Sequence, residues 1–453
     1  MANGQVIDDQ NDPEAAAAST IRGARAVWIL GALVLGLLLG AVAARLGDGL
    51  REPALKAATI VGGLWLDALK MTVIPLIFAL LVTGIAKGAE AARAGRIAGR
   101  SVLWFVIICT ASAIFGALAI GGLLDLFPLP ENAAEALRAG LVALDPTAAS
   151  SPVPQVADFF RSIIPPNVIS AAAEGQVLQL VIFAFIFALA LTRIGAAKRK
   201  SVVALFEGIG DALLVVIGWV LWIAPLGVFA LTFAVGAGAG GAAFAALLHY
   251  VVLVSAVGVL VTLAAYVVAV AGGRLKLAAF ARAMIGPQAV AISTQSSLAS
   301  LPAMLAAARL IGTRDEVADV TLPLAVALFR ATGPAMNIAV AIYVAHWMGV
   351  EIGTGAMIAG IAVAAVASYG AVSLPGQISF FSSIAPIAFA MGVPVAPLAI
   401  LIAVETIPDI FRTLGNVTMD VAVTGAVNRR TPETESAIEQ KVSRPAMLRT
   451  RSA

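Results

Sequence analysis

The sequence contains a single cysteine, two histidines and few charged side chains, and each shortage removes a class of structure or function. Cys109 stands alone, so no intrachain disulfide can form. Two histidines cannot build a metal site by themselves, and no metal or other cofactor is expected. Charged residues make up only 12% of the 453 residues, hydrophobic residues make up 60%, and the mean hydropathy is +0.98. A chain with so little polar surface cannot fold as a water-soluble globule.

The charges that are present indicate membrane topology. The net charge is only +3, and the basic residues are dispersed among short loops and the two ends, so a nucleic-acid partner is not expected. By the positive-inside rule, both termini and the basic loops face the cytoplasm, in a multi-pass protein of the inner (plasma) membrane. We expect residues 1–24 and 429–453 to be disordered cytoplasmic tails. No set of nucleophile, base and orienting partner is recognisable, so an enzyme is not predicted.

Long apolar runs fill most of the remaining sequence. About 20 helical residues cross the ~30 Å hydrocarbon core of a bilayer. We expect such spans at 27–46, 63–85, 102–126, 177–194, 202–235 and 244–270. The runs are continuously apolar and do not alternate, which excludes a transmembrane barrel. The predicted fold class is therefore an all-α polytopic membrane protein embedded in the lipid bilayer.

Two later apolar segments are interrupted by polar and helix-breaking residues. The first break is QSSLASLP at 295–302, and the second is SYGAVSLPG at 368–376. Each indicates two half-helices that meet at an irregular tip, a re-entrant hairpin, and paired broken segments point to the binding site of a transporter. Each SLP run is followed by Phe-Arg, at 329–330 and 411–412, which indicates inverted repeats. Two kinked spanning helices are the alternative.

The last apolar segment carries a stripe of polar residues. They are spaced by four, three, four and four positions and are Glu405, Asp409, Arg412, Asn416 and Asp420. This spacing places all five on one helical face. Because a charged side chain at bilayer depth costs at least ~2.5 to 3.5 kcal/mol, the stripe has to face protein, water or solute. We interpret it as a binding site. The alternative is a structural salt-bridge network, with Asp409 and Arg412 paired at i,i+3.

The residue types in the stripe suit an acidic amino acid. The guanidinium fork of Arg412 can grip a carboxylate through two hydrogen bonds, and Asp409 can accept hydrogen bonds from an ammonium group. At the first break, the hydroxyl groups of Ser296 and Ser297 and the positive ends of half-helices would supply donors for the α-carboxylate. Such serines are also common in helix interfaces.

Arg330 is a second arginine inside an apolar run. No Asp or Glu occurs between positions 322 and 344, so its counter-ion must come from another segment. Asp420 is the candidate partner. The alternative is that the side chain of Arg330 extends to the membrane surface.

The run DIFRTLGNVTMD at 409–420 resembles the eighth helix of the dicarboxylate/amino acid:cation symporters, a family that includes archaeal aspartate transporters and mammalian excitatory amino acid transporters. MTVIPLIF at 71–78 and APLGVFA at 224–230 are similar to the same family, and the resemblance covers nearly the whole chain. It implies that Asp409 holds the amino group of the substrate, that Arg412 holds its side-chain carboxylate, and that Asn416 also contacts it. Members that carry dicarboxylates without an amino group tend to lack that aspartate, so Asp409 favours an amino acid.

The resemblance also implies an architecture. It implies eight transmembrane helices plus two re-entrant helical hairpins, in a homotrimer whose transport domains slide past a fixed scaffold, an elevator mechanism. Residues 25–240 would be mainly scaffold and trimerisation helices, although helix 3, at about 98–127, would belong to the transport domain. Residues 241–428 would form the core transport domain, with helix 6, hairpin 1, helix 7, hairpin 2 and helix 8. Hairpin 2 would be the gate and would contact substrate at Ser373 and Gly376.

The sequence departs from the family where sodium-coupled members bind cations. The asparagine, aspartate and threonine of the seventh-helix motif Asn-Met-Asp-Gly-Thr are replaced by Phe329, Ala331 and Gly333. The tyrosine, threonine and serine of the third helix are replaced by Phe105, Ile108 and Cys109. Sodium is a hard cation that needs a cage of oxygen ligands, and these oxygen-bearing side chains are missing together.

Arg330 takes the methionine position of that motif, near the cation site in which Asp420 would be a ligand. We therefore predict a secondary transporter of aspartate or glutamate that has lost sodium coupling. Arg330 would substitute for the bound cation, and transport would be uncoupled or proton-linked through Glu405 or Asp409. The alternatives are a sodium-coupled acidic amino acid or C4-dicarboxylate symporter and, from another class, a channel or solute sensor. Because the threonine replaced by Gly333 helps to hold the substrate in the family, the preference among aspartate, glutamate and a dicarboxylate stays open.

Overall fold

All regular elements that the structure describes are helices, as predicted. The computed structural model describes residues 13–44, 48–93, 95–129, 135, 166–174, 177–239, 242–369 and 376–431. The helices in its first half are α1 Pro13–Ala43, α2 Asp48–Arg93, α3 Arg96–Leu126, α6 Val168–Ala173, α7 Val177–Leu191, α8 Ala196–Trp222 and α9 Ala224–Ala239. The second half contains α10 Ala242–Val267, the π-helical turn η2 Val268–Gly272, α11 Leu277–Thr294, α12 Leu301–Leu310, α13 Asp315–Leu328, α14 Thr332–Met348, α15 Thr354–Ala367, α16 Gly376–Ala390, α17 Ala396–Leu401 and α18 Thr406–Arg430.

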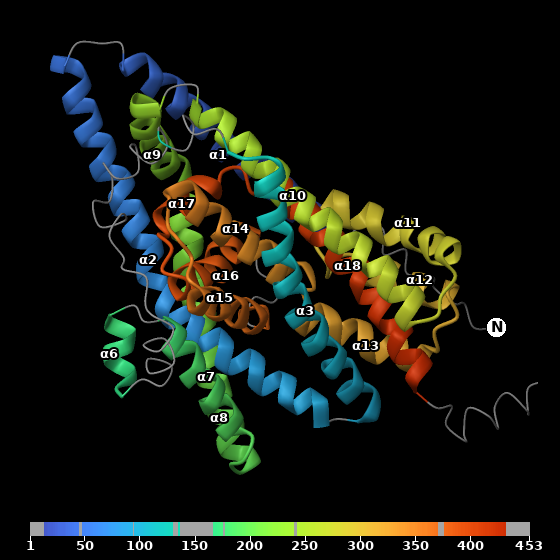
Figure 1. Cartoon of the computed structure of the whole chain (residues 1–453). Helices are drawn as coiled ribbons and strands as arrows, with labels where there is room; N and C mark the ends of the chain where they lie inside the picture. Colours follow the sequence, from blue (N-terminus) through green and yellow to red (C-terminus); the bar gives the residue numbers. More distant parts are fainter. Residues whose placement is uncertain are drawn as a thin grey trace, which may run out of the picture.

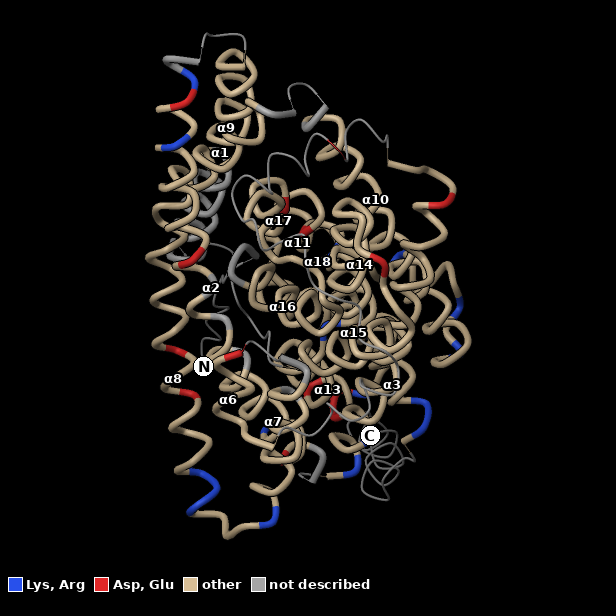
Figure 2. The backbone as a smooth tube through the Cα atoms, turned by 60° about the vertical axis from the view of Figure 1, so that its left-hand side comes forward, with Lys and Arg blue, Asp and Glu red and all other residues tan. Residues whose placement is uncertain are grey.

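Several of these helices suit a bilayer. Within the described ranges, five segments are long and apolar enough to cross a membrane by length and composition, and they are Arg51–Ala91, Arg96–Leu126, Ala196–Trp222, Phe244–Gly272 and Asp315–Met348. Large apolar side chains are freely exposed on the outer helices: Trp28, Trp219 and Trp222 are each about 70% exposed. Figure 2 shows long uncharged stretches of backbone between helix ends that carry lysine and arginine. Such a surface is stable only against lipid or a further protein.

The helices pack in two groups (Figure 1). In the first, α1 lies along α9, and α2 packs against α7, α8 and α9. In the second, α18 lies at the centre and is covered by α10, α11, α13 and α14, while α3 packs against α14. The division of these groups into a fixed scaffold and a moving transport domain stays a prediction.

Three helix boundaries differ from those expected. Helix α1 begins at Pro13, within the segment 1–24 that was expected to be a disordered tail and before the expected span 27–46. The segment 202–235 was expected to be one span, but the structure divides it at Ile223 into α8 and α9. Pro225 follows two residues later, and a proline restricts the residue before it and lacks the N–H that a helix needs. Helix α2 has 46 residues and extends beyond the expected span 63–85 at both ends, because its polar ends continue the helix outside the apolar run.

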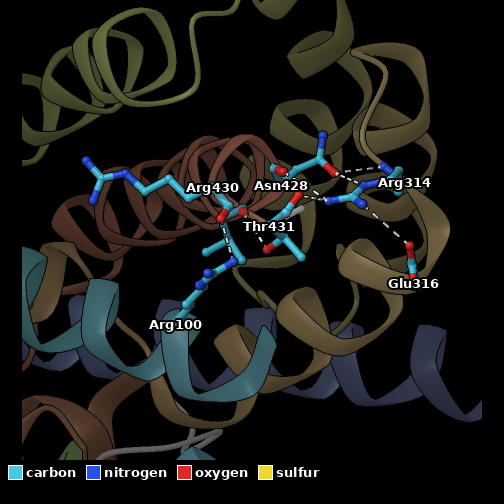
Figure 3. Close-up of polar contacts among 7 residues, drawn as sticks. Arg100, Arg314, Glu316, Asn428, Arg430 and Thr431 are labelled. Atoms are coloured by element: carbon cyan, nitrogen blue, oxygen red, sulfur yellow. Dashed lines mark hydrogen bonds and ion pairs between the residues drawn. The ribbon is translucent and has the colours of Figure 1, made fainter. Parts of the chain in front are cut away.

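Three helices are tied together at the C-terminal end of α18 (Figure 3). Arg314, which precedes α13, donates through Nε to Asn428 Oδ1 at 3.0 Å and through Nη2 to the carbonyl oxygen of Thr431 at 2.6 Å. Arg100 of α3 donates to the carbonyl oxygen of Arg430 at 2.5 Å. The last carbonyl groups of a helix have no partner within the helix and carry the negative end of its dipole. The two arginines therefore cap α18 and hold it against α3 and α13.

Candidate functional site

Helix α18 carries the candidate site on its buried face. Asp409, Arg412, Asn416 and Asp420 lie along this face, and Glu405 directly precedes the first turn. All five side chains are buried. A charged or amide group withdrawn from water needs a counter-charge or a hydrogen-bond partner. The partners of these side chains therefore determine what the site can bind.

Arg412 makes its shortest contact with Glu405, which lies seven positions earlier in the sequence. Arg412 Nη2 lies 2.6 Å from Glu405 Oε1, whereas Arg412 Nε lies 3.9 Å from Asp409 Oδ1. Tyr250 of α10 donates a hydrogen bond of 3.2 Å to the other oxygen of Glu405. The contact between Arg412 and Glu405 is an ion pair whose angles do not make a hydrogen bond, and Arg412 Nε and Nη2 have no hydrogen-bond acceptor among the described residues. The guanidinium therefore retains donors for a guest.

Asn416 is held by Thr332, at the start of α14. The backbone nitrogen of Thr332 donates to Asn416 Oδ1 at 2.9 Å, and its hydroxyl oxygen lies 2.6 Å from the same atom. Asn416 Nδ2 is buried and has no acceptor within the described part of the chain. Thr332 was not among the site residues predicted from the sequence. The available signal was its position: it is the one hydroxyl residue in the run 329–333.

Arg330 lies in a break between two helices, since α13 ends at Leu328 and α14 begins at Thr332. It is within electrostatic range of Asp409 and Asp420. The expected direct ion pair between Arg330 and Asp420 does not occur among the described residues, and both oxygens of Asp420 and Nε of Arg330 lack hydrogen-bond partners there. The positive charge of Arg330 therefore interacts electrostatically with the two carboxylates without a direct ion pair.

An aromatic pair occupies positions where the resemblance would place oxygen ligands. The rings of Phe105 and Phe329 stack with their centroids 4.5 Å apart and their planes 9° from parallel. Both side chains are fully buried, as is Cys109. Ser112 of α3 donates to the carbonyl oxygen of Ala331 close by, so that carbonyl is already engaged. The two rings offer no ligand to a hard cation.

The first predicted break lies between α11 and α12, two helices that both pack against α18. Helix α11 ends at Thr294, and Gln295 adopts a left-handed conformation with φ 50°. Ser296 Oγ accepts a hydrogen bond of 3.2 Å from the backbone nitrogen of Ala299, so it stabilises the turn. No hydrogen bond joins Ser296 or Ser297 to α18 in the described ranges.

The second break, with Ser373, lies outside the described residues. Gly376 begins α16. The substrate contacts predicted for Ser373 and Gly376 stay predictions.

The arrangement on α18 offers both signs of partner to a small solute. Arg412 and Asn416 present unpaired donors one helical turn apart, and Asp409 presents an acceptor one turn before Arg412. No group of three or more His, Cys, Asp or Glu side chains could hold a metal ion in the part of the chain that is described. The chemistry available is therefore recognition of a guest that carries carboxylate groups and, beside Asp409, an ammonium group.

Residues 26–430 match the model of the Sodium:dicarboxylate symporter family. Over 393 residues the chain is 29% identical to the proton/sodium-glutamate symport protein of Bacillus subtilis, with 85% of this chain and 89% of the relative covered. It is 27% identical over 411 residues to the C4-dicarboxylate transport protein of Laribacter hongkongensis, with 88% of each chain covered. It is 26% identical over 401 residues to the proton/glutamate-aspartate symporter of Escherichia coli, covering 86% of this chain and 89% of the relative.

Proposed function

Because the chain belongs to the sodium:dicarboxylate symporter family, a family of membrane transporters and not of enzymes, we propose that it is a secondary carrier of aspartate or glutamate that works without sodium. The relatives named above are described as symporters or transport proteins for glutamate, aspartate or C4-dicarboxylates. All of these solutes carry two carboxylate groups. The substrate class proposed for this chain is therefore a small dicarboxylic acid, with an amino acid favoured over a plain diacid.

One observation carries the choice of an acidic solute. The buried face of α18 holds two donor groups without acceptors, on Arg412 and Asn416, in adjacent turns. Residues four positions apart on a helix have Cβ atoms about 5 to 6 Å apart. One carboxylate can bind the guanidinium while a second binds the amide, which suits a diacid with a short carbon chain.

Asp409 supports an amino acid over a plain diacid. Its carboxylate lies 3.9 Å from Arg412 Nε, so the shorter contact with Glu405 leaves it able to accept hydrogen bonds from an ammonium group. A plain diacid would leave this buried carboxylate without a positive partner from the solute. Leaving a buried charge unpaired is unfavourable.

Sodium independence is supported by what fills the expected cation site. The stacked rings of Phe105 and Phe329 occupy positions where sodium-coupled members of the family are expected to have oxygen ligands. Arg330 adds a fixed positive charge close to Asp409 and Asp420. A resident guanidinium repels a metal ion and supplies the compensating charge itself.

The charge balance of the cluster supports a proton as the only coupling ion. Glu405, Asp409 and Asp420 contribute three acidic groups, whereas Arg330 and Arg412 contribute two basic ones. An anionic solute adds further negative charge to a buried site, which is costly unless a proton accompanies it. Glu405 and Asp409 are the candidate proton acceptors. The carrier is uncoupled if neither takes up a proton when solute binds.

The family relationship further supports a homotrimer of elevator type with eight transmembrane helices and two hairpins. In this proposal the helices around α18 form the moving unit, and α1, α2, α7, α8 and α9 belong to the scaffold. Both termini would face the cytoplasm from the inner membrane.

Uptake of labelled L-aspartate by proteoliposomes tests the proposal. We expect saturable uptake that exchanges with internal L-aspartate and is unchanged when sodium is replaced by choline. A proton gradient imposed separately should accelerate uptake if transport is proton-linked and leave it unaltered if it is uncoupled. Uptake that requires a sodium gradient would reject sodium independence, and conductance without solute exchange would indicate a channel. Competition by succinate measures the preference for an amino acid.

A further inference from the structure

The first turn of α14 is capped by a residue from another helix. Thr332 is the first residue of α14, and its N-terminal neighbour Ala331 provides no side-chain cap. The first backbone N–H groups of a helix have no partner within it. Asn416, in the middle of α18, accepts the N–H of Thr332 at 2.9 Å. The amide side chain of Asn416 thus connects the start of α14 to the polar face of α18.

These contacts determine which way the amide of Asn416 is turned. A backbone N–H can only donate, so the atom that faces it must be the amide oxygen. The hydroxyl of Thr332 lies 2.6 Å from the same oxygen and 2.7 Å from the carbonyl oxygen of Arg412, both of which are acceptors. The hydroxyl therefore donates its hydrogen on this side. The NH₂ group of Asn416 is left on the other side, where it is buried without an acceptor among the described residues.

The close approach of the two helices depends on a glycine next to Asn416. A Cβ atom at Gly415 would lie 2.3 Å from Cγ2 of Thr332 and 3.0 Å from Oγ1 of Thr262. Both distances are shorter than ordinary contacts between such atoms. Gly415 therefore leaves the space in which the branched side chain of Thr332 sits, with its hydroxyl directed at Asn416.

We propose that Thr332 is a positioning residue that locks the amide of Asn416 with its NH₂ group toward the solute. The lock makes Asn416 a donor beside Arg412, so that this end of the site accepts only a negative or electron-rich group. The inference rests on the proposed function, because it assigns a role in binding an acidic solute. It adds a residue of the seventh-helix segment to the specificity of the site without any contact between that residue and the solute.

A cap that serves stability alone is the competing explanation, and Asn416→Asp separates the two. An aspartate keeps one oxygen for the N–H and hydroxyl of Thr332, so a cap survives. Its second oxygen replaces the NH₂ group, so a donor becomes a negatively charged acceptor. A structural cap predicts unchanged binding for this variant, whereas the lock predicts loss of binding.

The experiment measures binding of L-aspartate and succinate to the purified full chain. Removing one buried hydrogen bond changes affinity by about three- to tenfold, so we expect this loss for Thr332→Val. Thr332→Ser keeps the hydroxyl and should stay within about twofold of the wild type. Asn416→Asp should lose at least ~100-fold, since it sets two negative groups against each other. In an Asn416→Ala background, Thr332→Val should cause no further loss, because the residue that it positions is absent.

Several results would overturn the lock. They are equal losses in Thr332→Ser and Thr332→Val, losses that multiply in the double variant with Asn416→Ala, and wild-type affinity in Asn416→Asp. Thermal unfolding without solute tests the same contact independently of binding. There Thr332→Val and Asn416→Ala should be non-additive, and additivity would count against the lock. If the wild type binds neither probe, the proposed function fails, and the unfolding data still decide whether Thr332 and Asn416 are coupled.

Discussion

Glu405→Gln tests the buried ion pair directly, because the structure contains a matched pair at its surface. Arg412 Nη2 and Glu405 Oε1 are 2.6 Å apart, with side chains only 4% and 1% exposed. Lys87 Nζ and Glu207 Oε1 are 2.7 Å apart, with side chains 56% and 38% exposed. The two pairs have nearly the same length and differ in burial. Glu207→Gln is therefore the control for the same chemical change.

The expected stability losses differ several-fold. Removing one partner of a buried pair costs about 3 to 5 kcal/mol, since the other charge is left uncompensated. Asp409 Oδ1 remains 3.9 Å from Arg412 Nε and partly compensates its charge. We therefore expect Glu405→Gln to lower the free energy of unfolding by about 3 kcal/mol. An exposed pair contributes at most about 1 kcal/mol, which bounds Glu207→Gln. Thermal unfolding in detergent, without solute, compares the two variants.

The same substitution should strengthen solute binding. A solute carboxylate bound at Arg412 would add a second negative charge beside that of Glu405, and two like charges about 8 Å apart repel by about 2 kcal/mol at an effective dielectric constant of about 20. Removing the charge of Glu405 should therefore tighten binding of L-aspartate by roughly 30-fold. If Glu405 is also the proton acceptor, uptake by the variant should no longer respond to a proton gradient. Weaker binding, or a stability equal to that of Glu207→Gln, would refute the reasoning.

Three further predictions concern packing, capping and charge. A Cβ atom at Gly116 of α3 would lie 2.4 Å from backbone atoms of α14, so Gly116→Ala should lower the free energy of unfolding by about 3 kcal/mol. Gly121 lies on the same helix with open space around it, so Gly121→Ala should leave stability unchanged, and equal melting temperatures for the two variants would contradict this. Asn428→Ala removes the side-chain acceptor of Arg314 and should cost about 1 to 2 kcal/mol in the same assay, and an unchanged melting temperature would show that the cap is not stabilising. Arg330→Met should weaken L-aspartate binding without creating a response to sodium, because the oxygen ligands remain absent; sodium-stimulated binding in this variant would contradict the proposal.

Local patterns in the sequence were sufficient for the class of fold and for the polar face of α18. Continuous apolar runs predicted helices, and every described element is helical. The spacing from Glu405 to Asp420 predicted one polar face, and that face is buried. The break at Gln295 was visible because small polar residues interrupt an apolar run there. Each of these features depends on neighbours a few positions apart, which a helical period relates directly.

The tertiary structure alone decided how the polar residues are partnered. The decisive contacts join residues from α10, α14 and α18. They are the ion pair between Arg412 and Glu405, the hydrogen bond from Tyr250 to Glu405, and the hydrogen bond from Thr332 to Asn416. No periodicity within one helix specifies which atoms of separate helices meet, since this depends on how the helices cross and how closely they approach. Composition and spacing therefore determined that the chain is a helical membrane protein with a buried charged face. Packing determined which donors on that face remain open to a solute.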